Sequence, residues 1–236
     1  LMGEGFVFRN AHYNYIPTYT GPGHASVYTG TTPRVHGIIA NDWYDKYNQK
    51  ERYCVEDEEV KAVGGDDNGH RSPKNLKATT MTDELKLFYQ NRSRVVGIAL
   101  KDRGAILPAG HQPDGAYWFD SKTGNFITST FYAETLPEWV TKFNKKKLPA
   151  KYMKKGWDTY KPIDQYVESA RDDRPYEVKE LGGLPSVFPY DFSQFDEAVN
   201  PNQILKVTPH GSTLTTDLAL AAFDGEQLGA DGITDF

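Results

Sequence analysis

The order of hydrophobic and polar residues along the chain predicts an alternation of strands and helices. A continuous apolar run at 95–100 is bounded by polar residues, which is typical of a strand buried on both faces of a parallel sheet. A shorter strand is predicted at 5–12. The apolar pieces 116–119 and 126–129, on either side of a polar turn, predict a hairpin. These segments would supply the sheet.

Three further segments have helical patterns. The segment 80–90 predicts a helix because Thr80 followed by Asp83 resembles a capping box. Its apolar face would be formed by Leu85, Phe88 and Tyr89. A second helix is predicted at 138–145. The third, at 213–223, is amphipathic, with Asp217 in its first turn and apolar residues at i, i+4 and i+8, namely Leu214, Leu218 and Ala222.

The order of these elements predicts an α/β protein in three parts. Residues 1–146 would form the first part of the α/β core. Residues 147–207 are mostly irregular and rich in Pro, Tyr and charge, which is typical of an inserted cap. Residues 208–236 would return to the core as a helix.

Composition narrows the class of protein. The chain has 236 residues, enough for one substantial core with an insertion, and a formal net charge of -5, which argues against a nucleic-acid-binding surface. No apolar run approaches the roughly 20 residues that a membrane-spanning helix needs. The single cysteine, Cys54, cannot form an internal disulfide, so the redox compartment stays open, as does the oligomeric state.

A Gly- and Pro-dense turn at 16–30 places a hydroxyl residue, Thr20, at or just before a predicted helix. Pro22 suits the first helical position, and Gly30 suits the end of the helix. The free N–H groups and the positive dipole end of such a helix favour an anion, either a phosphate or the alkoxide of an activated threonine. The alternative, which spacing alone favours, is that Thr20 is an ordinary helix cap.

Lys101 and Arg103 follow directly after the apolar run at 95–100. If the chain stays extended there, the two cations point to one side of the strand and Asp102 points away. Cations at the carboxyl end of a central strand lie where open α/β sheets bind ligands, and this pair suits the oxygens of a phosphate. A solvated charged turn is the alternative.

Other polar residues carry weaker signals. Asn41 follows the apolar piece 37–40, where its amide could donate to a phosphate oxygen or serve as a turn residue. The six histidines form no His-x-x-x-His or Asp-x-x-x-His metal pair. His24 and His36 lie near Thr20 in the sequence and could support a site indirectly. Neither a phosphate-cradling Gly-rich loop ending in Lys-Ser/Thr nor a Gly-x-Ser-x-Gly elbow occurs.

Four segments together resemble the alkaline phosphatase superfamily: 10–24, 29–45, 101–110 and 208–215. More narrowly, they are similar to the bacterial zinc-dependent, phosphate-irrepressible alkaline phosphatases, which are related to nucleotide pyrophosphatases and phosphodiesterases. The resemblance extends over almost the whole chain, and the block around Thr20 is its most specific part. It implies an alkaline-phosphatase-like central sheet flanked by helices, with an inserted irregular cap.

The resemblance implies roles for four residues. Thr20 would be the catalytic nucleophile and a metal ligand, while Asn41, Lys101 and Arg103 would be catalytic and substrate-binding residues. The implied reaction is hydrolysis of small-molecule phosphate monoesters through a phosphothreonine intermediate at a site with two zinc ions. A phosphodiesterase or nucleotide pyrophosphatase of the same superfamily is the alternative enzyme.

Of the zinc ligands that the resemblance implies, only Thr20 falls within the chain. We therefore expect an internal fragment of a longer enzyme, with an incomplete core and no activity by itself. The same resemblance implies a periplasmic or secreted location. A non-catalytic domain that binds anions is the remaining alternative, and zinc content would discriminate between the two.

Overall fold

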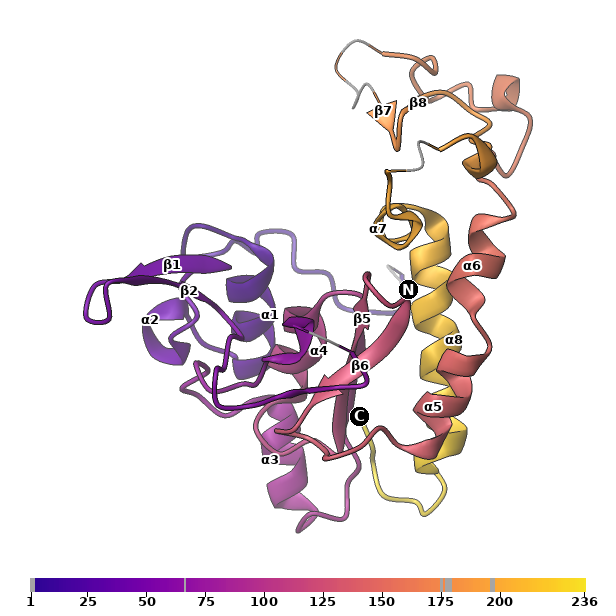
Figure 1. The fold of residues 1–236 in the computed structure, drawn as a ribbon. Coiled ribbons are helices and arrows are strands. Elements are labelled where there is room, and N and C mark those ends of the chain that lie inside the picture. The colour runs from indigo at the N-terminus through magenta and orange to yellow at the C-terminus, as the bar shows by residue number, and fades with distance from the viewer. Residues whose placement is uncertain (1–2, 66, 175, 177–179, 196–197) are drawn as a thin grey trace.

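The described part of the chain is built around a mixed four-stranded sheet with helices on both faces (Figure 1). The computed structural model describes residues 3–65, 67–174, 176, 180–195 and 198–236, so parts of the predicted core and cap at 1–2, 66, 175, 177–179 and 196–197 lie outside the described residues. The strand order is β3 (Ala62–Val63), β6 (Asn125–Ser129), β5 (Gly115–Asp120), β4 (Val96–Ala99). The predicted α/β class is therefore confirmed.

The apolar run at 95–100 forms β4, which pairs with β5 in parallel through the crossover helix α4 (Asp102–Ala109). Gly97 permits this packing, because a Cβ there would lie 2.2 Å from the carbonyl oxygen of Ala105. The strand is less buried than predicted, since in the described sheet it has a strand neighbour on one side only. The fully buried strand is β5, whose six residues are all enclosed.

Side chains of β5 alternate between two apolar clusters. Ala116 and Trp118 pack into the cluster that includes residues of α4 and of α1 (Thr20–Thr29). Tyr117 and Phe119 pack into the opposite cluster, with residues of α5 (Glu138–Lys145) and α8 (Pro209–Glu226). Figure 1 shows these two pairs of helices on opposite sides of the sheet.

The predicted hairpin is confirmed, because β5 and β6 pair antiparallel. The prediction of a strand at 5–12 is wrong: these residues form turns and extended coil. Phe6 and Phe8 are 84% and 78% exposed, and their rings contact each other edge to face. This segment has the composition of a strand but pairs with no strand among the described residues.

The helix predicted at 80–90 is α3 (Met81–Phe88), and its predicted capping box is present, with Thr80 and Asp83 bonding to each other's backbone N–H groups. The predicted apolar face is wrong, since Phe88 is 78% exposed. The buried face carries Thr82, Asp83 and Lys86 instead, because α3 packs beside the polar carbonyl end of α4.

Helix α5 matches its predicted bounds, and α8 is longer than the predicted 213–223. Leu214, Leu218 and Ala222 are buried as predicted. Asp217, however, lies in the middle of α8 and not in its first turn, because the helix already begins at Pro209. There its carboxylate accepts a hydrogen bond from Tyr152.

Between α5 and α8 the described residues form mostly turns and short elements: α6 (Leu148–Met153), β7 (Glu180–Leu181), β8 (Leu184–Pro185) and α7 (Pro201–Leu205). Trp157 and Tyr190 pair in an isolated antiparallel bridge. Figure 1 shows this segment rising beyond the end of the sheet. The name "cap" is kept below for 147–207, and the three-part division stays a prediction.

The segment between α1 and α3 contains α2 (Pro33–His36), the hairpin of β1 (Asp42–Asp45) and β2 (Lys50–Tyr53), and a 3-10 turn at Asp67–Gly69. Further 3-10 turns lie at Ile163–Gln165 and Phe192–Gln194. None of the helices in the described ranges is both long and apolar enough to cross a membrane.

Candidate active site

Thr20 is the first residue of α1, with Tyr19 as the N-cap, and its side chain is exposed. Tyr19 itself makes no side-chain capping bond to this helix start. Pro22 is the third helical residue and not the first, while Gly30 ends the helix in the left-handed conformation, as predicted. The hydroxyl of Thr20 is therefore presented at the positive end of a helix, where an anion is favoured.

Asn41 is held against the start of α1. The N–H of Gly21 donates to Asn41 Oδ1 at 2.7 Å. This bond uses one of the helix N–H groups that the sequence predicted to be free, and Pro22 has none to offer. Because Oδ1 of Asn41 is occupied as an acceptor, its Nδ2 hydrogens are oriented to donate elsewhere. No strand forms at 37–40, and Asn41 directly precedes β1.

The extended arrangement predicted for Lys101 and Arg103 is wrong. Lys101 is the N-cap of α4, and Arg103 is already the second helical residue, with Gly104 N bonded to Lys101 O at 2.9 Å. The pair thus lies at a second helix start, at the carboxyl end of β4. Asp102 does not point away from the pair, because its carboxylate accepts hydrogen bonds from Tyr53 and Arg71.

A network of hydrogen bonds positions Arg103. Arg103 Nη1 donates to the hydroxyl oxygen of Tyr53 at 2.8 Å, and Tyr53 in turn donates to Asp102. Arg71 Nε donates to the other oxygen of Asp102 at 2.9 Å. Burial, reinforced by the charge of Asp102, raises the pKa of Tyr53 above its ordinary value and keeps its proton on. Arg103 Nε is buried without a partner among the described residues.

The β1–β2 hairpin joins the two halves of the site. Its register pairs Asp42 with Tyr53, and Cys54 N donates to Asn41 O at 2.9 Å. Tyr53, which accepts the hydrogen bond from Arg103, therefore lies opposite Asp42, the residue that follows Asn41. Helix α1 also packs against α4. Residues that are distant in the sequence are thereby brought to one region.

The two candidate supporting histidines have different roles. His36 is buried: Ile38 N donates to its Nδ1 at 3.2 Å, so Nε2 carries the hydrogen that faces Ser26 Oγ at 2.9 Å. This bond ties α2 to α1. His24 lies closer to the site, where burial, followed by the charge of Arg103, lowers its pKa below the ordinary value.

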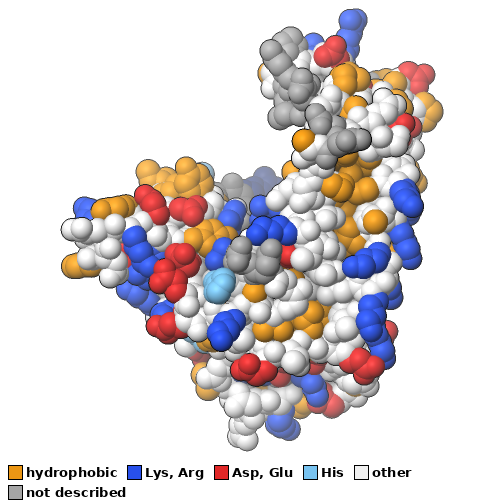
Figure 2. Space-filling view, viewed as in Figure 1, with side chains coloured by type: hydrophobic (Ala, Val, Ile, Leu, Met, Phe, Trp, Pro, Cys, Tyr) orange, Lys and Arg blue, Asp and Glu red, His pale blue; other side chains and the backbone are white. Residues whose placement is uncertain are grey.

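A polar cavity of about 420 Å³ opens beside Lys101 and Arg103. Neither Thr20 nor Asn41 lines it. Its charged lining residues are Asp42, Arg71, Lys101, Asp102, Arg103 and Lys206. Figure 2 shows a notch between the cap and the side that carries α1, β1 and β2, with Lys and Arg side chains gathered on its floor.

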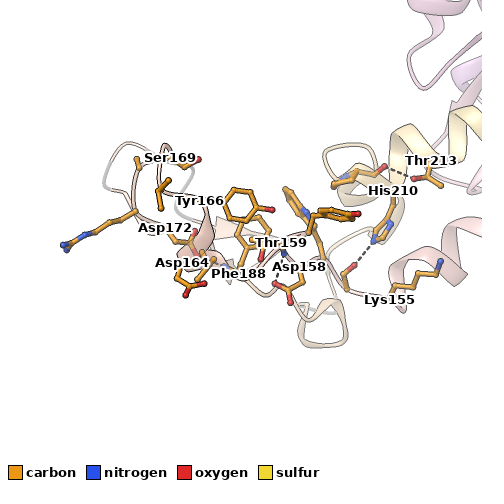
Figure 3. A pocket seen from close by; sticks show the side chains of 18 residues that line it. Lys155, Asp158, Thr159, Asp164, Tyr166, Ser169, Asp172, Phe188, His210 and Thr213 are labelled. Carbon is orange, nitrogen blue, oxygen red and sulfur yellow. Dashed lines mark hydrogen bonds between the residues drawn. The ribbon is translucent and has the colours of Figure 1, made fainter.

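A larger cavity, of about 1200 Å³, lies within the cap and at the start of α8 (Figure 3). It is lined by aromatic residues that include Trp157, Tyr166 and Phe188. His210 closes one end, with Nε2 2.6 Å from Gly156 O. None of the four predicted site residues lines this cavity.

A metal centre is not formed by the residues described. Among them, no group of three or more His, Cys, Asp or Glu could hold a metal ion. Zinc sites in proteins use three or four protein donors, so these residues alone do not fit zinc.

Tyr53, Arg71 and Lys206 were not predicted from the sequence as members of the site. Tyr53 lies 50 positions before Arg103, and Arg71 lies 31 positions before Asp102. No local pattern indicates these pairings. Lys206 follows a short helix of the predicted cap, where a lysine is an unremarkable surface residue.

Comparison with known proteins decides the family. The model of the type I phosphodiesterase / nucleotide pyrophosphatase family matches residues 1–200. The chain belongs to this family. Membership agrees with the resemblance drawn from the segments around Thr20 and Lys101.

Three relatives of this phosphodiesterase-family chain match all of it. Alkaline phosphatase PafA of Elizabethkingia meningoseptica is 48% identical over 239 residues. Alkaline phosphatase PhoV of Synechococcus elongatus and a protein named calcium-transporting ATPase from Myroides odoratus are each 47% identical. The chain spans 43% of the length of each of these relatives.

The fold of this family member is that of a solved alkaline phosphatase. A crystal structure of wild-type PafA superposes with a TM-score of 0.91 at 49% identity, covering 96% of this chain and 44% of that one. The predicted alkaline-phosphatase-like sheet is thereby confirmed. A PafA variant with one threonine, one asparagine, one lysine and one arginine replaced superposes equally well.

Proposed function

We propose that the protein to which this chain belongs hydrolyses phosphate monoesters, with Thr20 as nucleophile. The observation that carries the proposal is the arrangement of two helix starts, Thr20 with Asn41 and Lys101 with Arg103, joined through the β1–β2 hairpin. Two of the relatives, PafA and PhoV, are named alkaline phosphatases, and those names agree with this chemistry.

Residue spacing supports the assignment. In the PafA variant the replaced threonine and asparagine are 21 positions apart, and the replaced lysine and arginine are two apart. Thr20 and Asn41 have the same separation here, as do Lys101 and Arg103. The matching separations within each pair support the assignment of these four residues to the site.

In the proposed mechanism Thr20 Oγ1 attacks phosphorus, forming a phosphothreonine as the bond to the leaving oxygen breaks. Water then cleaves the phosphothreonine and releases inorganic phosphate. Asn41 Nδ2, fixed by the bond of Oδ1 to Gly21, donates to one phosphate oxygen. Lys101 and Arg103 neutralise the charge on the others, which is most of what a protein contributes to phosphoryl transfer.

The proposal extends to a metal requirement and to location. We propose two zinc ions in the whole protein, with Thr20 as one ligand and the remaining donors from parts of the relatives' length that this chain does not cover. Metal analysis of the whole protein tests this, because chelation should abolish hydrolysis and zinc should restore it. A periplasmic or secreted location is likewise proposed, and fractionation of cells tests it.

The decisive experiment compares a monoester with a diester. The whole protein and its Lys101→Ala and Arg103→Ala variants should be assayed with nitrophenyl phosphate and bis(nitrophenyl) phosphate. A monoester has one more negative charge near neutral pH, so each variant should lose about 10²-fold in kcat/KM on the monoester and less on the diester.

Two results would favour other functions. Faster diester hydrolysis by the unmodified protein, with no change of preference in the variants, would favour a phosphodiesterase, which the name of the matched family also covers. Phosphate binding without turnover or bound metal in the whole protein would favour a non-catalytic anion-binding role.

A further inference from the structure

The cap places a third cation beside the phosphate-binding pair. Lys206 directly follows α7, is half-buried, and lines the same 420 Å³ cavity as Lys101 and Arg103. Burial, followed by the charge of Lys101, lowers the pKa of Lys206 below its ordinary value, while the charges of Asp102 and Asp120 act in the opposite direction. The cap thereby adds a positive charge to the wall of the cavity that Lys101 also lines.

Packing fixes Lys206 in this position. Leu205 before it is fully buried in the cluster under α8. Gly211 lets the start of α8 approach, since a Cβ there would lie 2.8 Å from Leu100 Cδ1 and 3.3 Å from Lys206 Cα. At the other end of α7, Asn200 and Asn202 both donate to Ser121 O, at 2.8 and 3.1 Å.

The cavity wall between these anchors carries a polar group without a partner. Ser121 is 4% exposed, and within the described residues its Oγ has no hydrogen-bond partner. A buried hydroxyl in this state is destabilising unless a ligand or water satisfies it. Ser121 and Lys206 line the same cavity, as does Gln203.

The balance of charge in the lining favours an anion. Arg71 is paired with Asp102, at 2.9 Å, which neutralises both. Lys101, Arg103 and Lys206 have no ion pair with a carboxylate in the part of the chain that is described, and Asp42 is the remaining carboxylate of the lining. Two positive charges are thus in excess.

The phosphoryl group that Thr20 attacks does not account for the whole cavity. Asn41, Lys101 and Arg103 suffice for its oxygens, and neither Thr20 nor Asn41 lines the cavity. Lys206, Ser121 and Gln203 come instead from the cap and from the turn to which the cap is anchored.

We propose that Lys206, with Ser121 and Gln203, forms a subsite for a second anionic group, a carboxylate or a phosphate, carried by the leaving group of the substrate. The inference rests on the proposed monoesterase function and deepens it. It assigns to the cap the selection of phosphate monoesters that bear an additional negative charge.

The test compares substrates that differ in that charge. The whole protein, Lys206→Ala, Lys206→Arg, Ser121→Ala and the exposed cap control Lys151→Ala should be assayed with carboxyphenyl phosphate, phenylene bisphosphate and the neutral matched analogue carbamoylphenyl phosphate. We expect Lys206→Ala to lower kcat/KM about tenfold more on the two anionic substrates than on the neutral one, mainly through KM. Lys206→Arg should retain most of the preference, Ser121→Ala should lose part of it, and Lys151→Ala should retain all of it.

The outcomes are distinguishable. An effect on the bisphosphate alone would restrict the second group to phosphate, and one on the carboxylate alone would restrict it to carboxylate. Equal losses on the anionic and neutral substrates, or none, would overturn the subsite. If Lys206→Ala does not fold, the unmodified protein decides: carboxyphenylphosphonate should inhibit more strongly than carbamoylphenylphosphonate, and equal inhibition overturns the proposal. Absence of hydrolysis of all three esters by the unmodified protein would instead contradict the proposed function.

Discussion

The cavity within the cap and the cavity beside Lys101 and Arg103 differ in both size and chemistry. The cap cavity is nearly three times larger, about 1200 against 420 Å³, and is lined by Trp157 and other aromatic residues. The smaller one is lined by cations, by a buried hydroxyl that has no partner among the described residues, and by the Tyr53–Asp102 network. By volume alone the cap cavity would be the candidate site, whereas the excess of positive charge indicates the cavity at the start of α4.

Side chains that destabilise the fold when no ligand is bound are therefore a better guide to function than the volume of a cavity. Aromatic side chains around the cap cavity stabilise one another, as in the stacking of Trp157 on Tyr190 with ring centroids 5.2 Å apart. Lys101 and Lys206 line one cavity, where the charge of Lys101 lowers the pKa of Lys206, and an anion bound between them would relieve this repulsion. Four substitutions test this difference between the cavities.

The largest effect is expected at the helix start beside the small cavity. Thr20→Ala removes the proposed nucleophile and should lower kcat/KM for nitrophenyl phosphate in the whole protein by about 10³-fold or more. Thr20→Ser, which keeps a hydroxyl, should recover much of it. Thr18→Ala, an exposed threonine of the same loop, is the matched control. Wild-type activity of the Thr20→Ala variant would show that Thr20 is not the nucleophile.

The opposite behaviour is expected in the large cavity. Trp157→Ala removes ring contacts with Phe188 and Tyr190 and should lower the free energy of unfolding by about 2 kcal/mol, less than a fully buried tryptophan would cost. Its kcat/KM for nitrophenyl phosphate should stay within about twofold of wild type. Chemical denaturation and steady-state kinetics measure the two. A hundredfold loss of activity without a loss of stability would show that the cap cavity serves catalysis and that Trp157 does not stabilise the fold.

A smaller effect should appear where the network orients Arg103. Tyr53→Phe removes the hydroxyl that accepts from Arg103 and donates to Asp102, and we expect kcat/KM on the monoester to fall about tenfold, or about 1.4 kcal/mol. The fully exposed Tyr47, in the turn of the same hairpin, provides the control Tyr47→Phe. Equal activity of the two variants would show that Arg103 needs no positioning by Tyr53.

The smallest effect concerns a pair remote from both cavities. His111 contacts two acceptors, Asp83 Oδ2 at 2.8 Å and Leu76 O at 2.9 Å, and so carries both protons; its pKa is raised chiefly by the hydrogen bond to Asp83. Hydrogen bonds to His111 and Thr80 lower the pKa of Asp83 to about 2, against burial.

The sign of the pH dependence follows from both shifts. The raised pKa of His111 stabilises the fold below about pH 6.5, and this is lost as pH rises through its folded pKa. The lowered pKa of Asp83 stabilises above about pH 4, and this is lost as pH falls toward 2. His111→Gln should therefore cost about 1 kcal/mol in urea unfolding at pH 6 and little at pH 9. Equal costs at both values would contradict a charged His111.

Local features could be predicted from the sequence. The start of α1 at Thr20, the capping box at Thr80 and the bounds of α5 depend on residues a few positions apart, which act within one or two turns of helix. The strand at 95–100 was likewise marked by its own apolar residues. Each of these required no knowledge of distant parts of the chain.

The predictions that are wrong concern features that depend on contacts between residues far apart in the sequence. Residues 5–12 have strand composition, but a strand needs a neighbour to pair with, and composition does not supply one. The sequence pattern predicts an extended chain at Lys101 and Arg103, because α4 begins directly after β4 and no capping side chain marks its start. The bond between Tyr53 and Arg103 and the approach of Lys206 depend on tertiary packing alone.

The bridge between Trp157 and Tyr190 has a consequence for how this protein can diversify. Two backbone hydrogen bonds, of 2.9 and 2.8 Å, bring the chain back to the point where it departed, so 158–189 is an excursion with adjacent ends. Excursions of this kind tolerate changes of length, since closing a longer loop costs little additional entropy. Descendants of one ancestral gene could therefore exchange this segment wholesale while the backbone at its base, and the lysine that follows α7, keep their places.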